Sequence, residues 1–587
     1  MAATPTLSTT PQDLRANTVG QVLSRAPSWW DLAAIFLVLS VVILLGSGAK
    51  QMTAPFELTH PSPISLSPSV LPMYAVRTTL RMLAAIVASL IFTLVYATAA
   101  AKSRRAEIVL IPILDVLQSV PVLGYLSFTV VFFVSLFPGN TLGPELAAIF
   151  AIFTSQAWNM AFSFYQSLRT VPIDLEEASR SFRLSSWQRF WTLEVPFAMP
   201  GLVWNMMMSM SGGWFFVVAS EAISVGKIQI ALPGIGSYVA LAIEKRDLHA
   251  VGWAILAMTV TILAYDQLMF RPMVAWSDKF RSELTVSPVV PKSWVLDLFR
   301  RASLMQLIGE PVGLAFRVAL RSRMRRPGPS TTNKTPLIPS HVIDYVWYFL
   351  VMAGAIWSSA KVIKMIAPHL SLAEVRTVFL YGIITMIRVT VLIALASLIW
   401  VPIGVIVGLR PRLTQFIQPL AQFLAAFPAN LLFPLAVVLI VRYSLSPDIW
   451  LSPLMILGTQ WYILFNVIAG ASAFPGDFRE AALTFHIHGW KWWREVILPA
   501  IFPYYVTGAI TASGGAWNAS VVSEAVSWGH TNLAATGLGA YIEDMTKAGD
   551  FPRVALGISV MSLFVILTNR LIWRPLYTIA EERTRLS

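Results

Sequence analysis

Long apolar runs, each separated from the next by a short polar segment, dominate this chain. A first series lies near 30–48, 73–100, 107–137, 143–166, 197–225 and 248–270, and a second near 342–366, 380–408, 413–441, 448–472, 499–526 and 552–573. Their lengths match the ~20 residues that an α-helix needs to cross a bilayer. The pattern therefore predicts an all-α integral membrane protein with twelve transmembrane helices. Pro112 and Pro121 predict a kink or break in the third run.

The composition agrees with a membrane location. Hydrophobic residues make up 56% of the 587 positions and charged residues only 12%, about half the share found in a soluble domain. The segment 273–341 holds eleven Lys or Arg against four Asp or Glu. By the positive-inside rule this segment and both chain ends are predicted to be cytoplasmic. That rule also explains the net charge of +13 without a nucleic-acid partner.

The second half of the chain repeats the first at an offset near 303 residues. Glu177-Ala178 matches Glu480-Ala481, and Ser220-Glu221-Ala222 matches Ser523-Glu524-Ala525. Six spans per half and a cytoplasmic linker give both halves the same orientation. The sequence therefore predicts two parallel six-helix repeats, related by a pseudo-two-fold axis along the membrane normal.

This repeat divides the chain into four parts. They are a cytoplasmic tail (1–28), a first half (29–272), a basic linker (273–341) and a second half (342–587). Within the linker, Leu314 to Arg326 predicts a basic amphipathic helix. It is expected to lie on the anionic lipid of the inner leaflet, with a specific regulatory role as the alternative.

One polar segment in each half, 171–196 and 474–499, carries a shared pattern. Each has a Pro-x-Asp start, a Glu-Ala pair, and a closing proline nineteen residues after the glutamate, at Pro196 or Pro499. Proline is tolerated in the first turn of a helix. Each segment therefore predicts a short helix–turn–helix outside the bilayer, followed by a membrane helix that starts at the closing proline.

This pattern resembles the EAA loop of ABC-importer permeases, and the resemblance covers nearly all of both halves. It implies a pseudodimer like the type I importers, in which each Glu-Ala helix docks in a groove of an ATPase subunit. The family's usual glycine, six residues after the glutamate, is replaced here by Arg183 and His486, which lack glycine's freedom at positive φ. The residues that the resemblance assigns to ATPase coupling are Glu177, Ala178, Arg183, Leu184, Glu480, Ala481, His486 and Ile487.

Two further stretches are similar to the nitrate, sulfonate and bicarbonate branch of that family, in its duplicated form. They are Ser-Glu-Ala-(Ile/Val)-Ser after a Gly-Gly pair, and Gly-(Ile/Leu)-Gly-(Ser/Ala)-Tyr. The resemblance implies ATP-driven import of a small anion across the bacterial inner membrane. It also implies two cytoplasmic ATPase subunits that hold ATP and Mg, and an extracytoplasmic solute-binding protein.

The chain itself is expected to hold no cofactor or metal and to catalyse no reaction. It lacks the Gly-x4-Gly-Lys-Ser/Thr loop that cradles phosphates. It has no cysteine, and His486 and His488, two residues apart, would face different sides of a helix.

Ionisable residues inside membrane spans are costly and suggest function. Glu221 and Glu524 lie late in the fifth span of each half, either near the outer gate of a central pathway or near the external interface with bonds to neighbouring backbone. Arg77, Arg81 and Arg388 are expected to snorkel to the outer interface, or to attract an anion. The candidates for the pathway are Trp158, Ser211, Gly212, Gly213, Trp214, Glu221, Trp461, Ser513, Gly514, Gly515, Trp517, Asn518 and Glu524.

Two other classes of protein are compatible with the composition. A secondary transporter with 6+6 parallel repeats would use Glu221 and Glu524 as ion carriers. A membrane scaffold or channel would need no such carriers. Both classes leave the two matched Glu-Ala loops unexplained.

Overall fold

The computed structural model describes residues 29–51, 64–225, 228–280, 293–302, 311, 313–314, 318, 340–474 and 476–584. These residues belong to two compact units. The first takes its residues from 1–47, 166–204 and 264–335, and the second from 48–165, 205–263 and 336–587. The second unit thus contains most of both predicted halves.

The first unit is built from short helices and the ends of longer ones. Its elements are most of α2 (Trp29–Gln51), α7 (Ile173–Ser181), α8 (Ser186–Arg189), the start of α9, α12 (Arg271–Ser277) and α13 (Trp294–Arg301). Leu298 of α13 and Ala302, the residue that follows this helix, are buried against Ala34 of α2. The predicted amphipathic helix from Leu314 to Arg326 lies outside the described residues, apart from Leu314 and Val318.

The second unit contains the long helices of both repeats. From the first half come α3 (Leu71–Lys102), α4 (Arg104–Ser119), α5 (Val122–Leu136), α6 (Leu142–Arg169), α9 (Val195–Glu221), α10 (Ile235–Glu244) and α11 (Leu248–Tyr265). From the second come α15 (Ser340–Ile366), α16 (Leu372–Gly408), α17 (Pro411–Ala426), α18 (Phe433–Arg442), α19 (Pro447–Trp450), α20 (Ser452–Leu457), α21 (Trp461–Ser472), α22 (Gly476–Thr484), α23 (Gly489–Trp492), α24 (Leu498–Ser523), α25 (Leu538–Ala548), α26 (Phe551–Thr568) and α27 (Arg574–Thr584).

The prediction of an all-α membrane protein is confirmed. Among the described residues, eight helices are long and apolar enough to cross a membrane, or up to ten if two bent pairs each form one span. Helix α15 and the pair α4 and α5 coincide with predicted spans but are not among these ten. The count of twelve spans therefore stays a prediction.

Two prolines break helices at matching places in the two repeats. Pro121 caps α5 two residues after Ser119, the last residue of α4, so the predicted break is confirmed there. Pro112, in contrast, lies inside α4. Pro428 precedes a short 3-10 turn, Ala429–Leu432, and the helices on either side of it differ in direction by 78°. Proline lacks the amide hydrogen that a continuous helix needs at these points.

The prolines at 196 and 499 do not start new helices, contrary to the sequence-based interpretation. Helices α8 and α9 form one continuous helix, Ser186–Glu221, and α23 and α24 form another, Gly489–Ser523. A π-helical turn precedes each proline, at Phe190–Glu194 and Trp493–Ile497. The extra residue in such a turn shifts the backbone hydrogen bonds by one position, which accommodates a residue without an amide hydrogen.

Each half also contains a β-hairpin that the sequence analysis missed. Strand β1 (Ala222–Val225) pairs with β2 (Ile228–Ala231), and β3 (Ala525–Trp528) pairs with β4 (Thr531–Ala534), both antiparallel. The fifth predicted spans, 197–225 and 499–526, therefore end earlier as helices, at Glu221 and Ser523.

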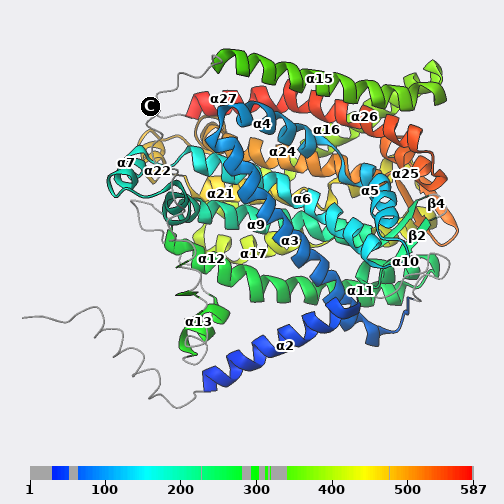
Figure 1. Ribbon diagram of the computed structural model, residues 1–587, viewed down its shortest axis with the longest axis horizontal. Coiled ribbons are helices and arrows are strands. Elements are labelled where there is room, and N and C mark those ends of the chain that lie inside the picture. The colour runs from blue at the N-terminus through cyan, green and yellow to red at the C-terminus, as the bar shows by residue number, and fades with distance from the viewer. Residues whose placement is uncertain are drawn as a thin grey trace, which may run out of the picture. The chain divides into compact units, whose positions relative to one another are not determined.

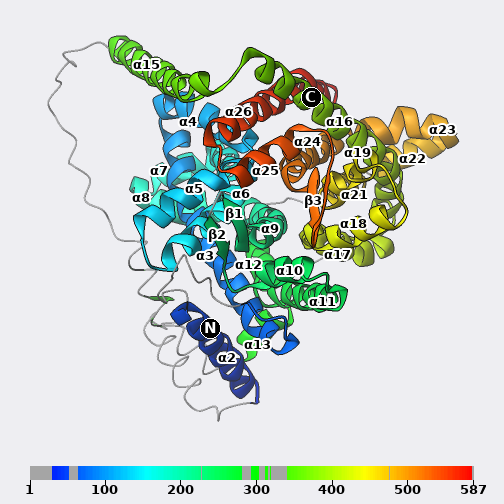
Figure 2. The same cartoon turned by 90° about the vertical axis from the view of Figure 1, so that its right-hand side faces the viewer.

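The two halves pack against each other within the second unit. Helix α5 of the first half contacts α24, α25 and α26 of the second. Strand β1 contacts α25, and β3 contacts α10, so each hairpin touches the helix that follows the other hairpin. Figure 1 shows β2, β4, α10 and α25 at one end of α24 and α22 at the other end, and Figure 2 shows α16, α21 and α24 side by side.

Candidate functional site

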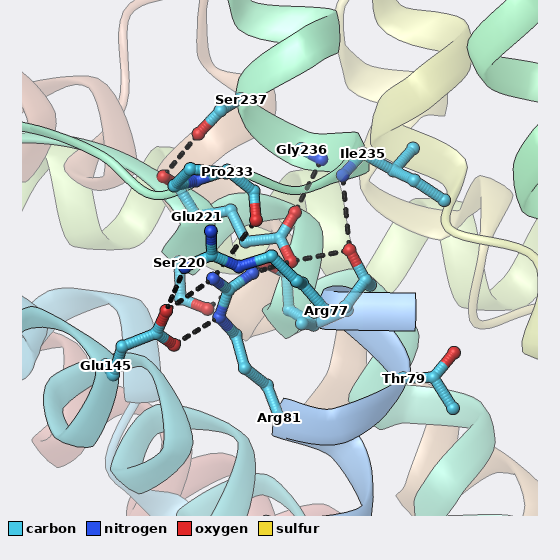
Figure 3. Close-up of polar contacts among 12 residues, drawn as sticks. Arg77, Thr79, Arg81, Glu145, Ser220, Glu221, Pro233, Ile235, Gly236 and Ser237 are labelled. Carbon is cyan, nitrogen blue, oxygen red and sulfur yellow. Dashed lines mark hydrogen bonds and ion pairs between the residues drawn. The ribbon is translucent and has the colours of Figure 1, made fainter. Parts of the chain in front are cut away.

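Glu221, the last residue of α9, lies at the centre of a buried polar network. Its Oε1 accepts hydrogen bonds from the Thr78 hydroxyl (2.7 Å) and the Arg81 guanidinium (2.6 Å), and its Oε2 accepts one from the Gly236 amide (2.6 Å). Figure 3 shows this carboxylate between Arg81 and the first turn of α10. A carboxylate at a helix N-terminus is also favoured by the helix dipole.

Arg81 connects this carboxylate to a second one. Its guanidinium donates two hydrogen bonds to Glu145, of 2.6 and 2.7 Å, and one of 3.1 Å to the Pro233 carbonyl. Arg77 adds a hydrogen bond of 3.2 Å to Glu145. Two arginines thus face two glutamates, and the side chains of all four are at most 7% exposed.

The second half repeats the network around Glu524. Its Oε1 accepts from the Thr385 hydroxyl (2.8 Å) and from Arg388 (3.3 Å), and its Oε2 accepts from the amides of Gly539 (2.6 Å) and Ala540 (3.2 Å). Asp448 stands where the first half has Glu145 and accepts a hydrogen bond of 2.9 Å from Arg388. The two networks therefore share a threonine, an arginine and a central glutamate at matching positions.

The Gly-x-Gly stretch after each hairpin is explained by this packing. A Cβ atom added to Gly234 or Gly537 would overlap the carboxyl group of Glu221 or Glu524. One added to Gly236 would overlap the Val218 carbonyl. Since φ at Gly234 is −179°, in the extended region, the requirement here is for a small residue and not for a left-handed backbone.

The charged residues of the first network, and Glu524 of the second, are buried and form ion pairs. The prediction that arginines snorkel to the outer interface is wrong for Arg77 and Arg81, because both are buried and paired with carboxylates. Glu221 and Glu524 are fully buried, and each has at least three protein donors, including backbone amides. A role of these glutamates in a transport pathway stays a prediction.

Of the pathway candidates, two directly face the other half. The Asn518 side chain accepts a hydrogen bond of 2.7 Å from the Val122 amide, at the first turn of α5. A Cβ atom added to Gly212 would lie 3.4 Å from the Tyr462 hydroxyl of the second half. These contacts place Asn518 and Gly212 at the junction of the halves.

Other candidates pack within their own half. Trp158 packs edge-on against Phe92, and Trp461 lies 4.9 Å from Trp400 between ring centroids. A Cβ atom at Gly213 would be 2.7 Å from the Gln156 amide nitrogen, and one at Gly515 would be 2.5 Å from Thr459. Four of the remaining candidates are buried, namely Ser211, Trp214, Ser513 and Trp517. The fifth, Gly514, has open space beside it, because an added Cβ atom would meet nothing within 4 Å.

The sequence analysis missed several residues of this region. Thr78 and Thr385 each donate to a glutamate and accept from the amide of Ile235 or Leu538, so each joins the network to a helix N-terminus. Asn430 donates a hydrogen bond of 3.3 Å to the Phe215 carbonyl across the halves. The available signal was the presence of polar residues within apolar runs, at matching places in the repeats.

The predicted coupling loops form the expected helix–turn–helix, α7–α8 in the first unit and α22–α23 in the second. Arg183 and His486 adopt left-handed backbone conformations, with φ of 52° and 56°. The next amides donate back into the helix, from Leu184 to the Ser179 carbonyl and from Ile487 to the Ala482 carbonyl. The turn therefore has the geometry that glycine usually provides, although neither residue is glycine. Pro475 lies outside the described residues.

Both loops present the same surface residues. The Glu-Ala pairs at 177–178 and 480–481 are exposed. Phe182 and Phe485, at the end of each first helix, are 78% and 76% exposed. The loops differ in the second turn, since the Ser185 side chain caps α8 whereas the residue that precedes α23, His488, makes no side-chain cap.

Comparison with known proteins identifies the family. Residues 91–271 and 401–573 each match the binding-protein-dependent transport system inner membrane component, and together the matches cover more than half of the chain. The chain belongs to this family. The two matches confirm the internal duplication of this inner-membrane transport component, and they make it a member of a permease family and not of an enzyme family.

Three relatives illustrate the range of similar proteins. The bicarbonate transport permease CmpB of Synechococcus elongatus is 28% identical over 33% of this chain and 66% of its own length. The nitrate import permease NrtB of Leptolyngbya laminosa is 26% identical over 32% of this chain and 63% of its own length. The glycine betaine/proline betaine permease ProW of Escherichia coli is 32% identical over 27% of this chain and 42% of its own length. Each match thus covers less than two thirds of the relative.

Proposed function

We propose that this chain is the permease subunit of an ATP-driven importer, with both of its six-helix halves in one polypeptide. Membership of the binding-protein-dependent transport family supports this function. The observation that carries it is the pair of matched surface loops, each with an exposed Glu-Ala pair and an exposed phenylalanine beside a left-handed turn. Large exposed apolar side chains in matched positions favour a protein partner.

The partners proposed for these loops are two cytoplasmic ATPase subunits, which hold the ATP and Mg that this chain is expected to lack. Phe182 and Phe485 are the anchors that enter the ATPase grooves, and Glu177 and Glu480 fix the orientation of the docked helices. In this assignment the loops, the linker and both chain ends are cytoplasmic. The two hairpins then face outward, where a solute-binding protein delivers the solute.

The two ATPase contacts are proposed to be unequal. Arg183 has a guanidinium with five N–H donors, whereas His486 has an imidazole ring with two nitrogens, so the two turns offer different partners to a docked subunit. The first loop also has a capping box between Ser185 and Gln188, which the second loop lacks. A better-capped helix loses less conformational entropy when it docks.

The solute is proposed to be a small anion. The relatives CmpB and NrtB are named for bicarbonate and nitrate, and ProW for betaines. Arg77, Arg81 and Arg388 already neutralise carboxylates in the networks. We therefore place recognition of the anion at the junction of the halves, at neutral donors such as Asn518 and Tyr462.

The test is reconstitution of the chain with its ATPase subunits in lipid. Glu177→Lys and Glu480→Lys are expected to abolish stimulated ATP hydrolysis, because a reversed charge in a docked groove opposes association. Glu244→Lys is the matched control, since Glu244 is exposed at the C-terminal end of α10, beyond the hairpin. Uptake that follows an ion gradient without any ATPase would refute the importer and favour a secondary transporter.

A further inference from the structure

The two hairpin networks differ at three matched positions. Pro233 of the first half corresponds to Thr536, Glu145 corresponds to Asp448, and Arg77 corresponds to Ile384. All three differences lie around the same junction, between the second strand of a hairpin and the helix that follows it. Because the two halves are repeats, these three substitutions can be related directly to the differences between the two networks.

The first network is buried throughout and balanced in charge, whereas the second has one half-exposed carboxylate and one arginine fewer. In the first half, two arginines face two glutamates, all nearly inaccessible to solvent. In the second half, Arg388 alone faces Asp448 and Glu524, and the Asp448 side chain is 52% exposed. A buried network has to be neutral because unpaired charge is costly away from water, whereas water stabilises the surplus charge of the second network.

Asp448 forms a contact with the second hairpin that has no equivalent in the first half. Its Oδ1 accepts a hydrogen bond of 2.6 Å from the amide of Thr536, two residues after the end of β4. Arg388 donates one of 2.8 Å to the Thr536 carbonyl. The corresponding Pro233 has no amide hydrogen, and only its carbonyl is bonded, to the buried Arg81. Both hairpins share one backbone hydrogen bond at their base, from the Ala535 amide to the Glu524 carbonyl (2.7 Å) and from the Leu232 amide to the Glu221 carbonyl (2.9 Å). What the second hairpin adds is the solvent-accessible pair of Asp448 and Arg388.

The tip of the second hairpin crosses to the first half. The Gly529 amide donates a hydrogen bond of 2.9 Å to the Ile243 carbonyl at the end of α10. Arg246 lies beside it and donates to the Thr531 hydroxyl at 3.4 Å. Gly529 has a φ of 58°, and an added Cβ atom would overlap the Arg246 side chain, so this close approach depends on glycine.

We propose that the β3–β4 hairpin is a releasable strap between the two halves, and that Asp448 is the positioning residue that holds it closed. Half-exposed ion pairs are weak and depend on salt, so a strap held this way opens and closes readily. The first hairpin, held by a buried and neutral network, stays fixed. Release of the second hairpin frees α10 of the first half from its contact with the second half.

The test uses the full chain in lipid nanodiscs, where its lack of cysteine leaves only introduced thiols reactive. Arg246→Cys and Thr531→Cys are combined, and the rate of linkage by a short bifunctional thiol reagent is measured. The rate is expected to be high at low salt and to fall at about 1 M salt, where screening acts beyond ~3 Å. Asp448→Asn is expected to lower the low-salt rate about tenfold, to the high-salt level, because its remaining side-chain oxygen is neutral and the ion pair with Arg388 is lost.

A second pair controls for general loosening of the fold. Gln118→Cys and Asn159→Cys replace two side chains of the first half that are hydrogen-bonded at 3.0 Å. Their linkage is expected to ignore both salt and Asp448→Asn, and Asp448→Glu is expected to restore part of the strap's rate. An unchanged strap rate in Asp448→Asn, or an equal fall in the control pair, would overturn the proposal. Should Asp448→Asn fail to fold, the salt series on the two pairs decides alone.

This inference is independent of the importer proposal. The measurement needs no ATPase, no solute and no transport. If the linkage rates behave as expected but the chain binds no ATPase, the strap proposal is supported and the importer proposal is refuted. If the chain works with ATPase subunits but the linkage rates do not change as expected, the importer proposal is supported and the strap proposal is refuted.

Discussion

Changing Glu221 and Glu524 to glutamine, one at a time, measures the value of charge balance in the two networks. Both changes keep the shape of the side chain and remove one negative charge. Glu221→Gln leaves Arg77 and Arg81 against Glu145 alone, with a surplus positive charge in a buried site. Glu524→Gln leaves Arg388 paired with Asp448, which is a neutral arrangement.

The magnitudes follow from that difference. Uncompensated buried charge costs about 3–5 kcal/mol. A lost hydrogen bond to a charged group costs only about 1.5–3 kcal/mol. Glu221→Gln is therefore expected to lower the free energy of unfolding more than Glu524→Gln. The double variant Glu221→Gln with Arg77→Ile copies the second half, where Ile384 stands in place of arginine, and is expected to recover part of the loss.

The assay is thermal unfolding of the purified protein in detergent, followed by fluorescence of its 21 tryptophans. The midpoint temperatures are expected to rank as wild type, Glu524→Gln, the double variant and Glu221→Gln, from high to low. Equal losses in the two single variants would refute the charge-balance argument. So would a double variant that is less stable than Glu221→Gln, because Arg77→Ile would then have removed a stabilising contact and not a surplus charge.

Three further changes test other contacts. Replacing Arg183 or His486 by glycine is expected to stabilise its loop by about 1 kcal/mol, since left-handed backbone is unfavourable for other residues, and hydrogen exchange of the loop amides checks this. Gly537→Ala is expected to disrupt the second network, because its Cβ overlaps the Glu524 carboxyl group, and a fall in the midpoint of thermal unfolding larger than that of Glu524→Gln is the measured result. Asn518→Ala is expected to weaken the contact between the halves by about 1 kcal/mol, the value of a helix cap, and faster exchange of the Val122 amide reports it.

Local patterns in the sequence were sufficient for the long helices, the break at Pro121 and the two helix–turn–helix loops with Glu-Ala pairs. Each depends on residues close together in the chain, such as the Glu-Ala pair and the proline that follows it. The hairpins had a local signal as well, since β-branched and aromatic residues flank the turn glycine, Gly529. That signal is hard to separate from the apolar helix that directly precedes it in the chain.

The networks could not be read from spacing. Arg81 and Glu221 are 140 residues apart, and Thr385 and Glu524 are 139 apart. The repeat indicates that Glu221 and Glu524 occupy equivalent positions, but only the packing of the helices shows which arginine forms an ion pair with each glutamate. The prolines at 196 and 499 were misread for a related reason, because the compensating π-turn involves the backbone and has no distinct sequence pattern.

In the arrangement proposed above, helix α24 connects the second Glu-Ala loop to the β3–β4 hairpin, and the π-helical turn Trp493–Ile497 lies at the loop end of that helix. Helix α24 continues from this turn for 26 residues, or about 39 Å. A tilt of about 10° at the turn moves the far end, where β3 begins, by about 7 Å. That displacement is more than twice the length of the hydrogen bonds that hold the strap. A rotation of this size at the Glu-Ala loop would therefore break the hydrogen bonds at the β3–β4 hairpin.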